Sequence, residues 1–230
     1  MGSFLKLFRG ATSEQRAATD AAPRISRRSS GLAELWRSLS SHEGQCVLDL
    51  GPTSPANIKH LTDMGHKVYS EDLLLASRDP GLRALDAEGT SVLDEKRFLA
   101  ENLAYDPHSF DTVLFWDVAD FMEEALVKPV VARVWSMMKP GGFVLAFFHT
   151  RDAGADAPCF RFHMSGPDTL DAQPLTVASE AHNGKKAARV PAYRLQRVFN
   201  NRNIENLFRD FSSLKFFLAR DNVREVLVTR

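Results

Sequence analysis

The pattern of apolar and polar residues predicts strands that alternate with helices along most of the chain. Short apolar runs, typical of strands covered on both faces, are separated by segments in which apolar residues recur every three or four positions. Leu32, Leu35 and Leu39, for example, would lie on one face of a helix. The main predicted strands are 46–50, 67–72, 110–116 and 143–148, and the main predicted helices are 31–40, 55–64 and 121–138. This order favours an α/β fold with a mostly parallel sheet between two layers of helices.

Two further parts of the pattern complete the expected sheet. A weak third strand is predicted to end at Phe98–Leu103, and Asp79–Gly81 interrupts a helical pattern before it. Near the C-terminus, Leu214–Leu218 and Glu225–Thr229 flank a short polar turn and follow a predicted helix over 201–211. They predict a hairpin, so the sheet is expected to end in an antiparallel C-terminal strand.

Two segments lie outside this alternation. Residues 1–30 combine a short apolar cluster with arginines among serines, which predicts a flexible N-terminal arm or, alternatively, a docking patch for a membrane or partner. Residues from about 149 to 200 predict an insertion, because Cys159–Met164 and Tyr193–Phe199 alternate like strands. We expect one domain over 31–230, with this insertion as a hairpin-like cap over the carboxyl ends of the strands. Such a cap would shape a substrate pocket or serve as a structural flap.

The composition narrows the classes of function. Lys+Arg and Asp+Glu number 29 each among the 230 residues, so the formal net charge is zero and favours neither nucleic acid nor an anionic membrane. No apolar stretch is long enough to span a bilayer, and the N-terminus lacks a sustained secretory apolar region. Cys46 and Cys159 make no disulfide framework, and no residues have metal-ligand spacing. We expect a cytoplasmic protein without a transmembrane segment, nucleic-acid partner or metal.

The first predicted strand carries the most informative motif, Cys46-Val-Leu-Asp-Leu-Gly51. An apolar run that ends in glycine and turns into a helix presents backbone N–H groups to a ligand. The stretch resembles the first motif of class I S-adenosylmethionine-dependent methyltransferases, acid-x-Gly-x-Gly-x-Gly. Asp49 holds the place of the acid and Gly51 that of the first glycine, whereas Thr53 and Pro55 stand at the next two glycine places.

Three later segments resemble the same family in the same order. Phe98–Leu103 is similar to its Asp-Ala-Glu-x-Leu-Pro-Phe segment, although Leu99 stands where the acid would be. Phe110–Asp117 is similar to the fourth strand, and Met138–Phe148 contains the Lys-Pro-Gly-Gly turn that precedes the fifth. The resemblance implies a Rossmann-like, doubly wound sheet in a three-layer αβα arrangement.

The resemblance also implies that the chain binds S-adenosyl-L-methionine. Asp72 lies about twenty residues after Gly51 and matches the family's ribose-binding acid, with Glu71 as a fallback. Alternatively, Asp72 would only cap the next helix. A hydroxyl of Thr53 or Ser54 would hold the carboxypropyl end in place of the missing glycines. The implied cofactor-binding residues are Asp49, Gly51, Pro52, Thr53, Asp72, Leu73, Ala100, Glu101 and Trp116.

The implied reaction is in-line transfer of a methyl group to a small-molecule acceptor. A general base is needed only when the acceptor is a hydroxyl or another weak acid. Asp117, after the fourth strand, and His149, at the end of the fifth, are the candidate catalytic residues, and His163 is a third candidate base. The segment Asp117–Asp120 does not resemble the Pro-Pro-aromatic motif of nucleic-acid amino-methylating enzymes.

The sequence also fits two other functions. The altered glycine places and Leu99 also fit a non-catalytic protein of this fold that acts as a binding or scaffold partner. A nicotinamide-dependent Rossmann enzyme fits less well, because the Gly-x-Gly-x-x-Gly pattern is absent from the sequence.

Overall fold

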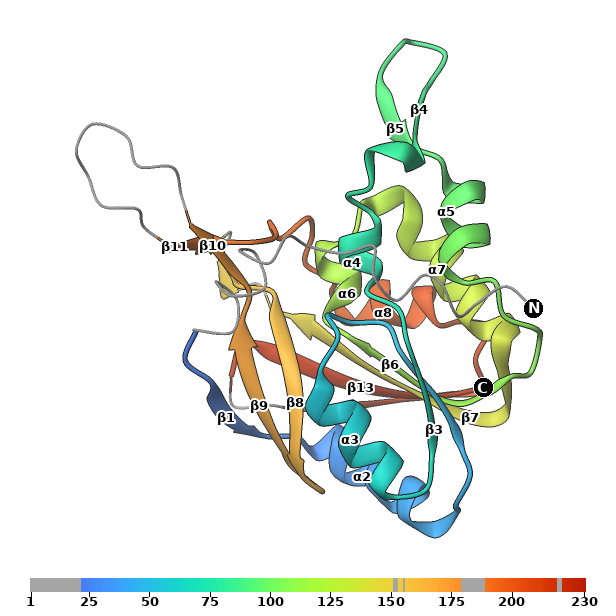
Figure 1. Cartoon of the computed structure of the whole chain (residues 1–230), viewed down its shortest axis with the longest axis vertical. Helices are drawn as coiled ribbons and strands as arrows, with labels where there is room; N and C mark the ends of the chain where they lie inside the picture. Colours follow the sequence, from blue (N-terminus) through green and yellow to red (C-terminus); the bar gives the residue numbers. More distant parts are fainter. Residues whose placement is uncertain (1–21, 151–152, 155, 179–188, 219–220) are drawn as a thin grey trace.

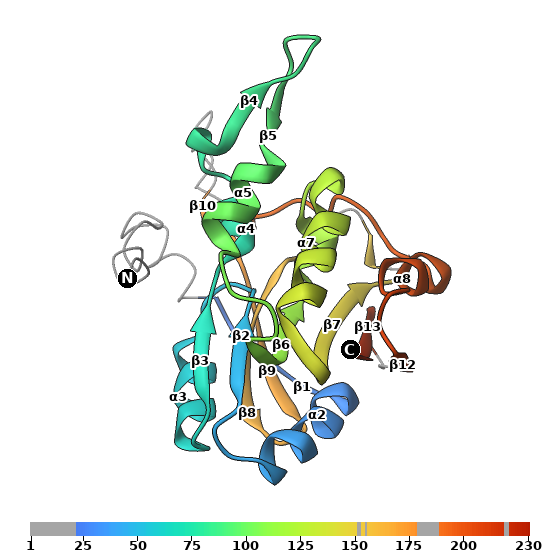
Figure 2. The ribbon, with the colours of Figure 1, turned by 90° about the vertical axis from the view of Figure 1, so that its right-hand side faces the viewer.

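A six-stranded, mostly parallel sheet forms the centre of the computed structural model, which describes residues 22–150, 153–154, 156–178, 189–218 and 221–230. The strand order is β12-β13-β7-β6-β2-β3 (Figures 1 and 2). The parallel strands are β2 (Cys46–Asp49), β3 (Lys67–Ser70), β6 (Phe110–Trp116) and β7 (Met138–His149). β13 (Val223–Thr229) runs antiparallel to β7 and to β12 (Ser213–Phe217). The predicted α/β class and antiparallel C-terminal strand are confirmed.

Helices cover both faces of this sheet (Figure 2). On one face, α2 (Ser30–Ser41) and α3 (Pro55–Asp63) share a buried apolar cluster with the sheet, and the predicted Leu32, Leu35 and Leu39 face of α2 lies within it. The opposite cluster includes residues of α5 (Glu95–Asn102), α7 (Glu124–Met137) and α8 (Asn201–Leu207). Burial of these side chains from water provides the main driving force for the three-layer arrangement.

The predicted third strand is wrong. Phe98–Asn102 belongs to α5, and Asp94 caps this helix by accepting a hydrogen bond from the backbone N–H of Arg97. Arg97 also pairs with Glu101 one turn later at 2.7 Å. Helix-favouring residues and this local pair therefore outweigh a short apolar run that suits either structure. As a result, the sheet ends at β3.

The segment between β3 and α5 forms small elements. It contains α4 (Leu73–Ala76), a 3₁₀ turn (Pro80–Leu82) and the hairpin of β4 (Arg83–Leu85) and β5 (Ser91–Leu93). The interruption predicted at Asp79–Gly81 is confirmed by the 3₁₀ turn, in which the Asp79 carboxylate accepts from the backbone N–H of Gly81. The hairpin projects from the body of the molecule (Figure 1).

A second sheet stands beside the first. β1 (Ile25–Arg28) pairs with β9 (Thr169–Pro174), which pairs with β8 (Phe160–Gly166), so the predicted strand over Cys159–Met164 is confirmed with slightly later bounds. The short strands β10 (Thr176–Ala178) and β11 (Arg189–Pro191) form a separate pair, whereas Tyr193–Phe199 is not a strand. Here backbone–backbone bonds from Gln196 and Arg197 run to Asp120, so the alternating pattern does not reflect strand pairing.

The N-terminal segment differs from the expected arm at its end. Arg27 of β1 is largely buried and forms an ion pair with Glu225 of β13 at 2.9 Å. Glu225 also accepts hydrogen bonds from the hydroxyl of Ser29 and the backbone N–H of Gly31. These contacts join β1 to the main domain, while residues 1–21 of the predicted arm lie outside the described residues.

The start of β7 explains the Lys-Pro-Gly-Gly motif. α7 ends at Met137 and β7 begins at Met138, so the two glycines lie near the start of the strand. Gly141 has a φ of 78°, and a Cβ at Gly142 would lie 2.7 Å from the carbonyl oxygen of Asp111. Both positions therefore require glycine for geometric reasons. No helix in the described part of the chain has the length and hydropathy needed to cross a membrane.

Candidate functional site

The carboxyl ends of β2, β3, β6 and β7 meet at one edge of the sheet, which is where α/β folds bind ligands. The loops there are tied together by backbone hydrogen bonds. The N–H of Glu71 donates to the carbonyl of Asp49 at 2.8 Å, and the N–H of Leu50 donates to the carbonyl of Leu114 at 3.0 Å. The acids after β3 therefore lie directly beside the turn that contains Gly51.

Asp49 is a buried carboxylate whose hydrogen bonds stay within the protein. One oxygen accepts from the indole Nε1 of Trp116 at 2.8 Å and from the backbone N–H of Gly51 at 3.2 Å. The other accepts from the amide of Asn57 at 3.3 Å. Burial raises its pKa to about 6, against the lowering effect of these donors. Asp49 thus holds the glycine turn in place.

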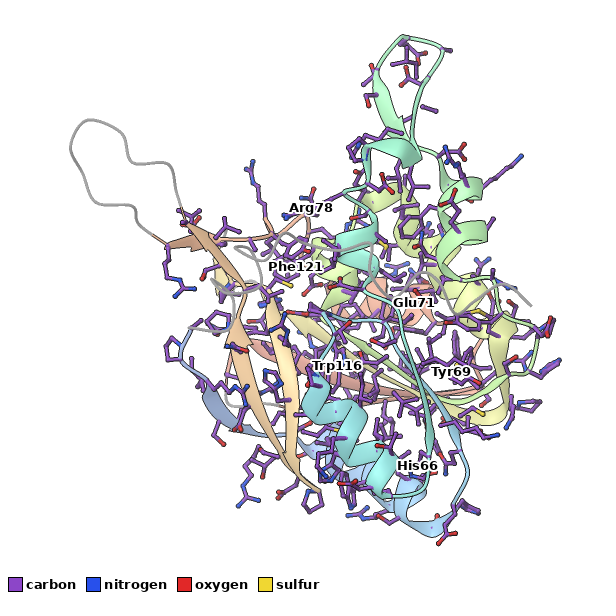
Figure 3. The ribbon with its side chains drawn as sticks, viewed as in Figure 1. His66, Tyr69, Glu71, Arg78, Trp116 and Phe121 are labelled. Atoms are coloured by element: carbon purple, nitrogen blue, oxygen red, sulfur yellow. The ribbon has the colours of Figure 1, made fainter. Side chains whose placement is uncertain are left out.

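Gly51 has no room for a side chain because Trp116 packs against it. A Cβ at Gly51 would lie 2.5 Å from Cδ1 of the Trp116 indole. Trp116, which is labelled in Figure 3, has a φ of 47°, a conformation that non-glycine residues rarely adopt. Its ring stacks on Phe162 of β8 with the ring centres 5.3 Å apart. The space that the glycine leaves is therefore filled by this chain's own indole.

The β8–β9 hairpin is attached to the start of α3 by polar contacts. The Asn57 amide donates to the carbonyl of Phe162 at 2.9 Å and accepts from the N–H of Met164 at 2.7 Å. The Ser54 hydroxyl, which caps α3, lies 2.8 Å from Nδ1 of His163. His163 is thereby brought to the edge as a buried, hydrogen-bonded residue, and burial lowers its pKa.

Asp72 occupies the end of β3, where the ribose-binding acid was expected. Its Oδ1 accepts from the N–H of Leu75 at 2.9 Å, so it caps α4, and burial raises its pKa. The adjacent Glu71, labelled in Figure 3, accepts a hydrogen bond from the hydroxyl of Tyr105 at 2.7 Å. Leu73 is fully buried in the apolar core, beneath the edge.

The remaining predicted cofactor contacts are spread more widely. Ala100 and Glu101 lie on α5, where Glu101 pairs with Arg97. Pro52 is buried, and the Thr53 side chain is exposed with its hydroxyl 3.2 Å from that of Ser70. The structure therefore brings Asp49, Gly51, Pro52, Thr53, Asp72 and Trp116 together at the edge, and places Ala100 and Glu101 on a helix instead of at the end of a third strand.

Asp117, the first candidate base, is fully buried after β6. One oxygen accepts from the N–H of Phe160 at 3.1 Å, and the Cys159 thiol lies 4.0 Å from the other. Burial raises the pKa of Asp117 to about 7, although His149 counteracts this. Burial also raises the pKa of the Cys159 thiol. Asp117 thus connects the end of β6 to the start of β8.

His149, the second candidate base, is paired with a residue that the sequence reasoning did not select. Asp120 of α6 (Val118–Phe121) accepts from the backbone N–H of His149 at 2.5 Å and lies 2.9 Å from its ring Nδ1. Burial lowers the pKa of His149, but the Asp120 bond and the charges of Asp117 and Asp120 outweigh it, so the net shift is upward. Burial raises the pKa of Asp120. An acid three residues after Asp117, on the same turn, was the signal available in the sequence.

The segment after β11 crosses the same edge. Arg78, at the end of α4, donates to the carbonyl of Ala192, and its guanidinium lies 3.8 Å from the centre of the Tyr193 ring. The N–H of Gln196 donates to the carbonyl of Asp120 at 2.8 Å. Two shallow cavities, one beside Tyr69 and Tyr105 and one beside Lys139, lie away from this edge. The described acids and histidines form no group that could hold a metal ion.

Comparisons with known proteins place this architecture. The sequence matches no protein-family model and none of the curated proteins. A protein of Pyrococcus horikoshii has a similar structure, with 15% identity, a TM-score of 0.50 and coverage of 95% of this chain and 92% of that one. An S-adenosylmethionine-dependent methyltransferase from Methanosarcina mazei has 14% identity and a TM-score of 0.47, with coverage of 82% of this chain and 93% of that one. The 1,6-didemethyltoxoflavin-N1-methyltransferase of Burkholderia thailandensis has 13% identity and a TM-score of 0.45, with coverage of 87% of this chain and 78% of that one. At these identities the likeness concerns the fold alone.

Proposed function

We propose that this chain, which has the fold of the class I S-adenosylmethionine-dependent methyltransferases, transfers a methyl group from S-adenosyl-L-methionine to a small molecule. One observation carries the proposal. Asp72 stands at the carboxyl end of β3, immediately beside the Asp49–Gly51 turn, because β2 and β3 are parallel neighbours with Asp49 opposite Ser70. An acid in this place can accept both hydroxyls of a ribose.

The residues at the edge fit the nucleoside part of this cofactor. Asp72 is half-buried, and its Oδ1 accepts the hydrogen bond that caps α4. Thr53 offers an exposed hydroxyl on the neighbouring turn. The cofactor would supply an activated methyl group on a sulfonium. The chain's own part would be to hold it beside the ends of β6 and β7, where Asp117 and His149 lie.

A small acceptor suits this edge better than a polymer. The formal net charge is zero, so no broad electrostatic attraction to nucleic acid is expected. The start of β8 and the segment around Tyr193 enclose the ends of β6 and β7, through Phe160 bonded to Asp117 and Gln196 bonded to Asp120. An acceptor that reaches these residues would have to fit among them.

A second function, binding without catalysis, is favoured by the contact between Trp116 and Gly51. The indole fills the space that the glycine leaves, and both oxygens of Asp49 are already hydrogen-bonded within the chain. A cofactor that approached Gly51 closely would have to displace the indole. If this arrangement is permanent, the edge serves only as a rigid surface for a partner.

Transfer of labelled methyl groups tests the proposal. The purified protein is incubated with S-adenosyl-L-methionine labelled on the methyl group and with a panel of small phenols, alcohols, amines and thiols. Label in at least one acceptor, dependent on protein, supports methyl transfer. Absence of transfer across the panel, together with no measurable cofactor binding, would favour the binding protein instead.

A further inference from the structure

Asp120 and His149 form a buried pair with unused hydrogen-bonding atoms. Their side chains are 0% and 3% exposed, and Asp120 Oδ2 lies 2.9 Å from His149 Nδ1. Within the described part of the chain, neither Nε2 of His149 nor Oδ1 of Asp120 has a hydrogen-bond partner. A buried polar atom without a partner is costly, so each one calls for an explanation. These two atoms point to a ligand that supplies hydrogen-bond donors.

The pairing determines which ring nitrogen is available. Asp120 Oδ2 already accepts from the backbone N–H of His149, so this oxygen is held close to the ring. A carboxylate so placed accepts a hydrogen bond from Nδ1–H, which keeps the proton of the neutral imidazole on Nδ1 and leaves the lone pair on Nε2. Nε2 can then accept a proton, and the carboxylate stabilises the resulting imidazolium. This is the arrangement required of a general base.

Two aromatic rings pack against this imidazole. Phe121 meets it edge-on with the ring centres 5.4 Å apart, and Phe160 lies parallel to it at 6.4 Å. Phe121 is buried, whereas Phe160 is partly exposed. An apolar skeleton that carries a polar hydrogen would be complementary to these rings.

We propose that His149 is the general base that removes the proton of a hydroxyl-bearing methyl acceptor, and that Asp120 positions its ring. The inference rests on the proposed function and specifies its acceptor. The acceptor oxygen forms a bond to the methyl carbon, the carbon–sulfur bond breaks with its electron pair left on sulfur, and the hydroxyl proton moves to Nε2. A neutral amine attacks before it loses a proton, so it would not need this base.

The charges around His149 predict how its protonation responds to pH. Asp117 and Asp120 face it from the β6–α6 turn, together with the Cys159 thiol beside Asp117. From the neighbouring β13 region, the charge of Asp221 raises the pKa of His149, and the charge of Arg224 lowers the pKa of Asp120. The pKa of His149 is raised overall, so methyl transfer should rise with pH through a pKa above the ordinary histidine value of 6.5.

Histidine NMR tests the pair without any cofactor. We expect the neutral His149 ring to carry its proton on Nδ1, and Asp120→Asn to lower the pKa of His149. His66 provides the control, because it is buried but lies before β3, far from Phe121 in Figure 3. Its signals should not change in the Asp120→Asn variant. A proton on Nε2 of neutral His149, or a His149 pKa unaffected by Asp120→Asn, would overturn the inference whatever the activity.

Methyl transfer to matched acceptors tests the role of the base. With phenols and alcohols, His149→Asn should reduce transfer by about 100-fold or more, a usual contribution of a general base. Cofactor affinity should be unchanged, and His66→Gln should behave like the wild type. Transfer to the corresponding amines alone, or equal transfer to phenols by His149→Asn, would reject His149 as base and leave methyl transfer standing. No cofactor binding by the wild type would instead reject the proposed function and, with it, this role.

Discussion

The indole Nε1 of Trp116 donates a 2.8 Å hydrogen bond to the carboxylate of Asp49 and thereby joins the ends of β6 and β2. Both residues are almost completely buried, with exposures of 2% and 1%. The same indole closes the space above Gly51. The bond therefore stabilises the turn and determines how much room the edge offers a ligand.

Removing this indole N–H should destabilise the protein. In Trp116→Phe, Asp49 loses its shortest hydrogen bond while remaining buried, so we expect the free energy of unfolding to fall by about 1–3 kcal/mol. Chemical denaturation measures the change. Trp135→Phe is a matched control, because Trp135 also donates its N–H, but from a partly exposed position to a backbone carbonyl. Equal losses in the two variants would contradict the importance assigned to the Asp49 bond.

Asp72→Ala should lower the affinity for S-adenosylhomocysteine by about tenfold or more. The variant removes the carboxylate proposed to accept the ribose hydroxyls, and one charged hydrogen bond accounts for roughly this change. Calorimetry measures the affinity. Asp79→Ala is the control, because Asp79 also caps a short helical turn but is exposed. Asp72 would be only a helix cap if both variants bound the ligand as tightly as the wild type.

Asn57→Ala should loosen the β8–β9 hairpin from α3. The variant leaves the buried N–H of Met164 and carbonyl of Phe162 without their amide partner, so the free energy of unfolding should fall by about 2–4 kcal/mol. Denaturation and limited proteolysis within β8 measure the effect. Asn102→Ala removes a single amide bond to the Phe98 carbonyl and serves as the comparison. If both variants lost the same stability, the hairpin would not depend on Asn57.

Stability should decrease from pH 4 to pH 8 because the buried acids favour the protonated form. Burial raises the pKa of Asp49 from 3.8 to about 6 and that of Asp117 to about 7. Between the unfolded and folded values the native protein binds more protons than the unfolded chain, so its stability falls as pH rises. The pKa shift of Asp49 alone corresponds to a loss of about 3 kcal/mol in the free energy of unfolding across this range. The raised pKa of His149 acts in the same direction above pH 6.5.

Denaturation at pH 4.5, 6 and 8 and constant ionic strength measures this dependence. Asp117→Asn should flatten it, since its side chain no longer titrates. The pKa of the surface residue Asp168 is lowered, so Asp168 acts in the opposite direction, and Asp168→Asn should steepen the decline slightly. A protein that became steadily more stable from pH 4.5 to pH 8 would contradict the assigned protonation states.

Local sequence signals were sufficient for much of the fold and part of the site. The apolar run before Gly51 and the acid at Asp72 follow from strand ends, and parallel pairing of β2 with β3 brings them together as expected. The strand predicted at Phe98–Leu103 is wrong because a short apolar run fits strand and helix alike, and the Arg97–Glu101 pair favours the helix.

The contacts that were missed depend on tertiary packing. Asp120 and His149 are 29 residues apart and meet because β6 and β7 are parallel neighbours. The carbonyl of Phe162, which accepts from the Asn57 amide, is 105 residues away in sequence. No short-range pattern contains such pairs, and a glycine motif does not show that an indole fills the space beside it.

Calorimetric titration with S-adenosyl-L-methionine, and separately with S-adenosylhomocysteine, tests the central claim most directly. If the edge beside Asp72 and Gly51 holds the cofactor, both ligands should bind with micromolar dissociation constants, and Asp72→Ala should weaken both. Absence of heat at millimolar ligand, in protein shown to be folded, would mean that Trp116 closes the site permanently. The chain would then be a non-catalytic member of this architecture.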